Sequence, residues 1–211
     1  MDTKNKVRGA IIGVAVGDAL GMPVEALLPC TIKQNFGWIS KYHRASKKSK
    51  YFRKLKCGQW TDDTQLTLAI GESIVDHKGV NYKDIASRHG KIFSNGKRGW
   101  GKATKAATQK ILDGYEWWAS GEKYAAGNGP PMKIAPVGIL YGLDAISKVD
   151  LISICANISY MTHKDKRAVI GAITQAYMVG YAIKNTITHV RNQLTFIKDF
   201  IVSLNGEVYN D

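Results

Sequence analysis

Two neighbouring carboxylates flanked by hydroxyl groups are the part of this sequence best suited to chemistry. They lie in the tetrapeptide Thr61-Asp62-Asp63-Thr64, which precedes an apolar run typical of a helix. Adjacent carboxylates repel each other, and the positive end of a helix dipole offsets only part of that repulsion. A Mg²⁺ or Mn²⁺ ion, which prefers oxygen ligands, would offset the rest. The pattern therefore indicates a divalent-metal site.

Helix capping is the alternative explanation of the same tetrapeptide. Thr61 or Asp62 would accept a hydrogen bond from the first turn of the helix, and Asp63 would favour that turn electrostatically. Taken alone, the tetrapeptide favours capping, because so short a motif is only a hypothesis about a metal.

A second candidate ligand site is the loop Gly127-Asn128-Gly129-Pro130-Pro131-Met132-Lys133, called the Gly-rich loop below. Its glycines let the backbone approach a ligand closely, Asn128 can donate and accept hydrogen bonds, and Lys133 could face an anionic group. A helix expected to begin just after the loop would present free N–H groups to a phosphate. A rigid turn without a ligand explains the loop equally well. The segment Arg98-Gly99-Trp100-Gly101 is a similar, weaker candidate.

One histidine is left without an obvious structural duty. In Thr162-His163-Lys164-Asp165, which starts another expected helix, Thr162 is a plausible N-cap with Asp165 three positions on. His163 is the residue that capping does not explain, although a lone histidine is more often structural than functional.

The composition is that of an ordinary folded protein with an excess of basic residues. The 211 residues, 45% of them hydrophobic, suit a single domain over residues 1–211. The formal charge of +13 would attract nucleotides, nucleic acid or phosphorylated partners. The densest basic run, residues 41–56, contains aromatic residues that could stack on nucleic-acid bases, but a solvated loop is the more common meaning of such a run.

The sequence gives no indication of export or of membrane insertion. The apolar stretch Ala10–Val16 is too short to cross a bilayer, and residues 1–9 are polar. The 3 cysteines are widely spaced and form no CxxC pair. This pattern suits a reducing compartment, so we expect a cytoplasmic protein.

Helical periodicity dominates the chain, and strand signals are weak throughout. We expect Pro23 to end the first helix, which places Asp18 and Glu25 near one helix terminus. A glycine every fourth residue along the same helix should allow a close helix neighbour. The pattern predicts an all-α domain with its function in the connecting loops. The expected helices span about 4–21, 61–77, 81–93, 102–113, 134–146, 149–159, 164–184 and 188–204.

Four blocks, in this order along the chain, together resemble the ADP-ribosylglycohydrolase family. They cover residues 9 to about 180, and the ordered set is specific although each block is modest. The resemblance implies a compact, orthogonal, all-α helical bundle of that family's type, short at its C-terminal end, around a dinuclear Mg²⁺ or Mn²⁺ centre. The blocks are Gly17-Asp18-Ala19-Leu20-Gly21-Met22-Pro23-Val24-Glu25, Trp60-Thr61-Asp62-Asp63-Thr64, Gly127-Asn128-Gly129 through Met132-Lys133-Ile134-Ala135-Pro136, and Thr162-His163.

The resemblance also implies a function and a role for each matching residue. The expected activity is hydrolysis of the N- or O-glycosidic bond between ADP-ribose and a protein side chain or small molecule, without a membrane partner. Glu25, Asp62 and Asp63 resemble the catalytic residues, and Thr61, Asp62 and Asp63 resemble the metal ligands. Lys133 stands where the family usually has arginine, so a bidentate contact would be lost there. The residues that resemble the substrate-binding set are Gly127, Asn128, Gly129, Met132 and His163.

The sequence departs from the family pattern after Thr162-His163. The family's second acidic motif, Asp-x-Asp-Ser/Thr, does not occur among Asp165, Asp199, Glu207 and Asp211. Half of the expected carboxylate ligands are therefore missing. Three explanations are open: the sequence is a fragment, another subunit or partner supplies the missing ligands, or the protein is a shortened relative. In the last case the alternative expectation is a weakly active or inactive protein that binds ADP-ribose or serves a structural role. A nucleic-acid-binding module is a more distant third.

Overall fold

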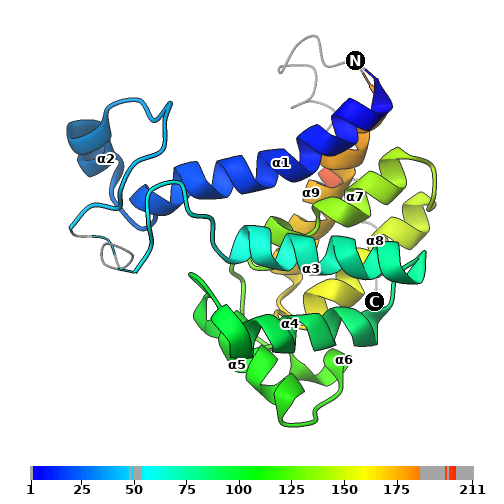
Figure 1. Ribbon diagram of the computed structural model, residues 1–211. Coiled ribbons are helices and arrows are strands. Elements are labelled where there is room, and N and C mark those ends of the chain that lie inside the picture. Colours follow the sequence, from blue (N-terminus) through cyan, green and yellow to red (C-terminus); the bar gives the residue numbers. More distant parts are fainter. Residues whose placement is uncertain (1, 48, 50–53, 186–197, 199, 203–211) are drawn as a thin grey trace.

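The computed structural model describes residues 2–47, 49, 54–185, 198 and 200–202 (Figure 1). Among these residues there is no β-strand, only one isolated bridge between Glu122 and His163. The prediction of an all-α fold is confirmed. The elements are α1 Thr3–Gly21, the 3₁₀-helix η1 Met22–Val24, α2 Pro29–Phe36, α3 Asp62–His77, α4 Tyr82–Gly96, α5 Lys102–Leu112, α6 Trp117–Ser120, the 3₁₀-helix η2 Pro131–Lys133, α7 Ala135–Gly142, α8 Lys148–Tyr160 and α9 Lys166–Lys184.

Most predicted helices are found where the periodicity places them, and the differences concern short elements and helix ends. The short helices α2 and α6 were not predicted. Helix α7 ends at Gly142 instead of 146, because the chain turns at Asp144, whose φ is 56°. The predicted helix at 188–204 lies largely outside the described residues.

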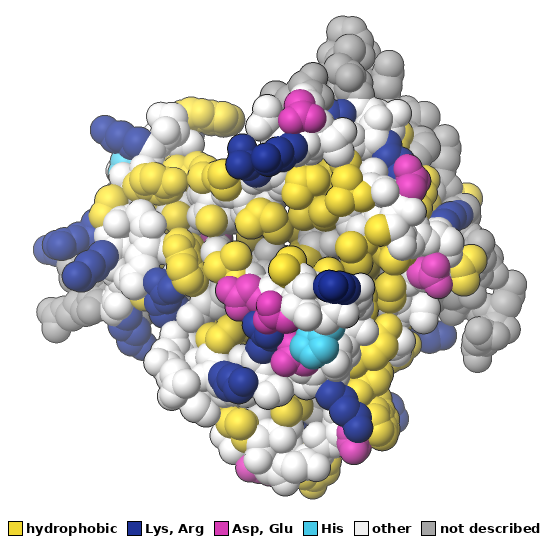
Figure 2. All heavy atoms as spheres, turned by 45° about the vertical axis from the view of Figure 1, so that its right-hand side comes forward, with side chains coloured by type: hydrophobic (Ala, Val, Ile, Leu, Met, Phe, Trp, Pro, Cys, Tyr) yellow, Lys and Arg dark blue, Asp and Glu magenta, His cyan; other side chains and the backbone are white. Residues whose placement is uncertain are grey.

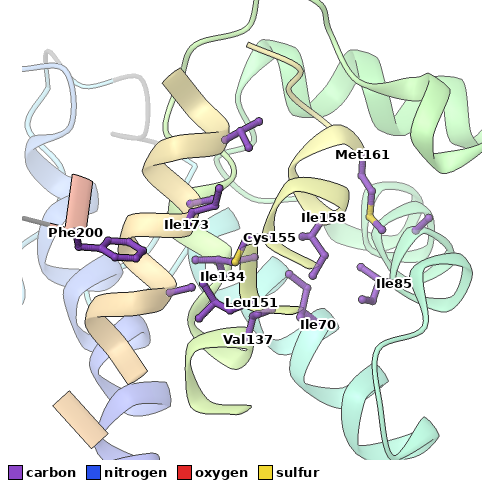
Figure 3. Close-up of a cluster of buried hydrophobic side chains, with 14 residues drawn as sticks. Ile70, Ile85, Ile134, Val137, Leu151, Cys155, Ile158, Met161, Ile173 and Phe200 are labelled. Carbon is purple, nitrogen blue, oxygen red and sulfur yellow. The ribbon is translucent and has the colours of Figure 1, made fainter. Parts of the chain in front are cut away.

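The core is built where five helices meet. Helix α9 packs against α7 and α8, and α3 lies between α1 and α4 (Figure 1). Each of the helices α3, α4, α7, α8 and α9 contributes side chains to one apolar cluster (Figure 3). Fully burying such a side chain stabilises the fold by about 1.5–3 kcal/mol. The cluster holds α3, and with it the two adjacent carboxylates, in place. Its labelled aliphatic members include Ile70, Ile85, Val137, Leu151, Ile158 and Ile173.

Helix α1 is covered on a small part of its surface. Ala19 is the only buried residue of α1, and Ile12 is 60% exposed. A Cβ added at Gly13 or Gly17 would meet nothing within 4 Å, so the expected close neighbour of the glycine stripe is wrong for the described residues. Figure 2 shows a band of hydrophobic side chains in yellow across this face. Residues of α1, α3 and α7 line an apolar cleft of about 720 Å³ there.

The first helix extends beyond its uninterrupted hydrophobic run at both ends. Within Thr3–Val24, a stretch of 22 residues, an 18-residue window has a mean hydropathy of 1.4, enough by length and composition to cross a membrane, and 17% of that window is buried. The expectation of a segment too short to cross concerned only the run Ala10–Val16, and the helix that contains this run continues to Gly21. A core helix of a soluble protein meets the same criterion, so this finding alone places nothing in a membrane.

Candidate functional site

Asp18, near the end of α1, holds the beginning of α3 through four hydrogen bonds. Its Oδ2 accepts from the backbone N–H groups of Thr61 at 2.7 Å and Thr64 at 3.1 Å, and from the Thr64 hydroxyl at 2.6 Å. Its Oδ1 accepts from the Thr61 hydroxyl at 2.7 Å. Because these N–H groups belong to the start of α3, the helix is capped by a carboxylate from another helix. In the sequence, Asp18 differs from its neighbours because it is an acidic residue on the otherwise apolar stripe of α1, and this is the pattern that could have identified it.

The capping alternative is wrong in its simple form. Thr61 occupies the N-cap position of α3, but its side chain makes no capping hydrogen bond, and Asp62 already lies inside the helix. Instead, the Thr61 hydroxyl donates a hydrogen bond to Asp18. Its oxygen lone pairs therefore stay available to bind a cation.

Asp62 and Asp63 line one cavity of about 400 Å³ together with Asp18 and Glu25, called the carboxylate cavity below. Burial raises the pKa of Asp62, and backbone N–H groups, among them that of Gly101, oppose part of this rise. Burial, followed by repulsion from Asp18 and Asp62, raises the pKa of Asp63 to about 7. Several carboxylates in one partly buried cavity are unfavourable unless protons or a cation neutralise them.

The oxygen ligands at this cavity fit a hard divalent cation in type, and only in part in number. Asp62, Asp63 and the Thr61 hydroxyl would supply oxygen atoms from adjacent positions. Among the described residues, however, no group of three or more His, Cys, Asp or Glu side chains is arranged to hold a metal ion. The part of the chain that the structure describes thus offers an incomplete ligand set, in keeping with the absence of an Asp-x-Asp motif from the sequence.

The Gly-rich loop and His163 form one packed unit. A Cβ added at Gly129 would lie 2.3 Å from Cε1 of His163, so only glycine fits there, and one at Gly127 would lie 3.6 Å from Nε2. Asn128 and Met132 line the carboxylate cavity, whereas Gly127, Gly129 and His163 are not among its lining residues. The structure therefore brings all five predicted substrate-binding residues together, but only two of them border the carboxylates.

His163 is a neutral, buried ring at neutral pH. It is 4% exposed, and its Nδ1 has no hydrogen-bond partner among the described residues. Burial, followed by the nearby charge of Lys133, lowers the pKa of His163 to about 4. The ring can therefore support the Gly-rich loop and accept or donate a hydrogen bond, but it adds no positive charge to the site.

Lys133 does not face a ligand, contrary to the expectation from the sequence. It is fully buried, its Nζ donates to Oγ1 of Thr162 at 3.0 Å, and burial lowers its pKa to about 7. Thr162 therefore accepts from Lys133 and does not cap α9. The N-cap of α9 is Asp165, whose side chain accepts from the N–H of Arg167. The reason is that the turn η2 directs Lys133 into the interior.

Gln65, a residue that the sequence analysis did not identify, holds the segment 96–101 beside the carboxylates. Its Nε2 donates to the carbonyl oxygen of Gly96, and its Oε1 accepts from the N–H of Arg98 and from Nε1 of Trp100. Gly99 and Gly101 of this segment line the carboxylate cavity. The weaker candidate segment is thus part of the site. The sequence offers little reason to single out Gln65, because glutamine is common on exposed helix faces.

We expect Gly129→Ala to destabilise the protein by about 1–3 kcal/mol, because the added methyl group overlaps the His163 ring and forces the loop or the ring to move. Urea unfolding measures the change. Gly127→Ala is the matched control, since its Cβ would make an ordinary contact at 3.6 Å. The double variant Gly129→Ala/His163→Ala should lose less than the sum of its two single variants, and simple additivity would contradict the packing described.

Comparison with known proteins gives a consistent result. The sequence model of the ADP-ribosylglycohydrolase family matches residues 1–208. An uncharacterized protein of Archaeoglobus fulgidus is 31% identical over 179 residues, which cover 83% of this chain and 55% of that protein. The ADP-ribosyl-[dinitrogen reductase] glycohydrolase of Rhodospirillum rubrum is 30% identical over 135 residues, covering 64% of this chain and 44% of that enzyme.

A solved structure shares the fold. The chain superposes on a protein of an ADP-ribosylglycohydrolase-related protein complex with a TM-score of 0.74 and 27% identity, over 94% of this chain and 62% of the other. The match covers 55% of the Archaeoglobus fulgidus protein and 44% of the Rhodospirillum rubrum enzyme, so the chain spans about half the length of these two relatives.

Proposed function

Because the chain belongs to the ADP-ribosylglycohydrolase family, we propose that it hydrolyses the glycosidic bond between ADP-ribose and an acceptor, with the help of Mg²⁺ or Mn²⁺. The observation that carries this proposal is the carboxylate cavity, where Asp62 and Asp63 meet Asn128 and Met132 of the Gly-rich loop. Carboxylates beside a loop with an accessible backbone suit a substrate that has both a ribose diol and a diphosphate.

The proposed roles follow from the position of each side chain. Asp62, Asp63 and the hydroxyl of Thr61 would hold the cation, and Asp18 keeps that hydroxyl oriented. A bound cation would orient the ribose hydroxyls and would lower the pKa of a nearby water molecule. Glu25 lines the same cavity and is suited to proton transfer between that water and the leaving acceptor. The hydroxyl group of the water joins the anomeric carbon, and its proton goes to the acceptor atom.

The Gly-rich loop would hold the ADP-ribose. Asn128 and Met132 border the cavity, while Gly127 and Gly129 lie against His163, which supports the loop from the interior. The acceptor is proposed to be an ADP-ribosylated protein or a small molecule that contains ADP-ribose. The enzyme of Rhodospirillum rubrum is named for an ADP-ribosylated protein substrate.

A second candidate function is ADP-ribose binding without turnover. The observation that favours it is the incomplete ligand set: the described residues contain no cluster of three or more acidic, His or Cys side chains arranged for a metal. Two carboxylates and a hydroxyl would bind divalent ions weakly, because fewer negative charges neutralise the metal.

Calorimetry and a release assay distinguish these functions. We expect titration with Mn²⁺ and then with ADP-ribose to show binding of both, and an ADP-ribosylated arginine peptide to release ADP-ribose only when Mn²⁺ is present. Binding of ADP-ribose without release from any ADP-ribosylated acceptor would support the second function. If neither Mn²⁺ nor ADP-ribose bound, both functions would be rejected, and a structural role would be the remaining one.

A further inference from the structure

A second cleft, strongly basic, adjoins the carboxylate cavity. It has a volume of about 470 Å³ and shares Gly99 and Gly101 with that cavity. No acidic residue lines it, and none of its basic side chains forms an ion pair with a described residue. We call it the basic cleft. The cations that line it are Lys54, Lys97, Arg98, Lys102 and Lys105.

The start of α5 adds to the positive potential of the basic cleft. The N-cap, Gly101, has no side chain to cap the helix, and the first turn of α5 contains no acidic residue, although the backbone N–H of Gly101 donates to Asp62. The first hydrogen bond of the helix runs from the N–H of Lys105 to the carbonyl of Gly101, so the N–H groups before it lie outside the ladder. Lys102 and Lys105 are therefore placed at the positive end of the helix dipole, which is unfavourable. An anion bound in the cleft would offset this repulsion.

Arg98 gives the basic cleft a flat surface as well as a charge. Its guanidinium carbon lies 3.8 Å from the centre of the Trp60 ring, and its backbone N–H is held by Gln65. Nucleic-acid bases stack on arginine planes and aromatic rings, while lysines contact the phosphates. An acidic peptide would use the charges but has no need of a stacking surface, so the combination favours a nucleic-acid strand.

Building on the proposed function, we propose that the basic cleft binds a single-stranded nucleic acid, and that this strand is the acceptor part of the substrate. The Gly-rich loop borders the carboxylate cavity at Asn128 and Met132, and the basic cleft borders it at Gly99 and Gly101. ADP-ribose on one wall and the strand on the other would meet at the two aspartates. The net charge of +13, from 30 basic and 17 acidic residues, would increase the rate of encounter.

Fluorescence anisotropy with a labelled oligothymidylate of about ten nucleotides tests the binding. Wild-type protein should bind at low salt, with an affinity that falls as salt rises. Lys102→Ala/Lys105→Ala should weaken binding about tenfold and should lower the slope of log affinity against log salt by about 1.4, the value for two lost phosphate contacts on a single strand. The matched control is Lys83→Ala/Lys91→Ala on α4, which removes the same charge from exposed positions outside the basic cleft and should leave that slope unchanged.

Two outcomes of the direct binding assay would overturn the site, and one outcome of a competition assay would do so as well. One is the absence of oligonucleotide binding by the wild-type protein at low salt, and the other is equal weakening by the two lysine pairs. Displacement of the strand by polyglutamate at equal charge concentration would assign the cleft to an acidic polypeptide, which also overturns the proposal. The strand used here is not ADP-ribosylated, so its binding does not depend on hydrolysis.

The acceptor role has its own assay. An oligonucleotide ADP-ribosylated at a terminal phosphate should have a higher kcat/KM for ADP-ribose release than an ADP-ribosylated arginine peptide, and Lys102→Ala/Lys105→Ala should reduce that preference. Preference for the peptide would overturn the acceptor role. Lack of release from both substrates, with strand binding retained, would reject the hydrolase function while leaving the binding site in place.

Discussion

Replacing Asp63 with asparagine is expected to make the metal-free protein more stable at pH 8 while it abolishes hydrolysis. Burial, followed by repulsion from Asp18 and Asp62, raises the pKa of Asp63 from 3.8 to about 7. The folded state therefore binds this proton more tightly than the unfolded state, and wild-type stability falls as the pH rises between these two values. The variant carries no charge at this position, so its stability should not fall for this reason as the pH rises. Removal of a metal ligand should reduce ADP-ribose release at least about 100-fold.

Thermal unfolding in EDTA at pH 5 and pH 8, together with the release assay in Mn²⁺, measures both effects. The fall in midpoint between the two pH values should be smaller in Asp63→Asn than in the wild type. Asp113→Asn, an exposed carboxylate at the end of α5, makes the same charge change and should alter neither stability nor release. If Asp63→Asn were the less stable protein at pH 8, Asp63 would be a helix-start residue that favours the dipole, and the metal-site proposal would be wrong.

Replacing Asp18 with alanine is expected to lower the free energy of unfolding by about 3 kcal/mol and to reduce hydrolysis strongly. The four hydrogen bonds from Thr61 and Thr64 would lose their acceptor. Both threonines are buried, at 3% and 4% exposure, so water cannot fully replace the carboxylate, and each buried unpaired donor costs about 1–3 kcal/mol. The Thr61 hydroxyl would also lose its orientation toward the cavity.

Urea unfolding at pH 7 measures the decrease in the free energy of unfolding. Two further variants separate the contributions of the individual hydrogen bonds to this decrease. Asp18→Asn keeps one acceptor oxygen and should fall between the wild type and Asp18→Ala. Thr64→Val removes one hydroxyl donor and should lose less than Asp18→Ala does. In a double-mutant cycle, Asp18 and Thr64 should show a coupling of at least about 0.5 kcal/mol. Additive effects would mean that Asp18 does not hold the start of α3.

The periodic part of the fold could be predicted from the sequence because the information is local. The apolar spacing of Leu66 and Ile70 indicated α3, and both side chains are fully buried. Helix α2 was missed although Pro29 begins it and Gly37 ends it with a φ of 62°. It has 8 residues, none of them buried, and its one apolar pair, Ile32 and Phe36, is too short a pattern to establish a helical period.

The sequence by itself determined which groups could act. Asp62 and Asp63 are neighbours because the chain joins them, the apolar run after them specifies a helix, and the glycines of the Gly-rich loop permit close backbone approach. These features depend on covalent adjacency and on helix periodicity, so no tertiary contact is needed to state them.

Only the tertiary structure decided how these groups are held and what surrounds them. Asp18 reaches Thr61 and Thr64 across 43 and 46 positions of the chain, Lys133 turns inward to Thr162, and the basic cleft comes to lie beside the carboxylates. Periodicity shows which face of a helix is apolar, but it does not show which helix will cover that face. Hydrogen bonds and charge clusters between distant residues therefore appear only when the helices pack.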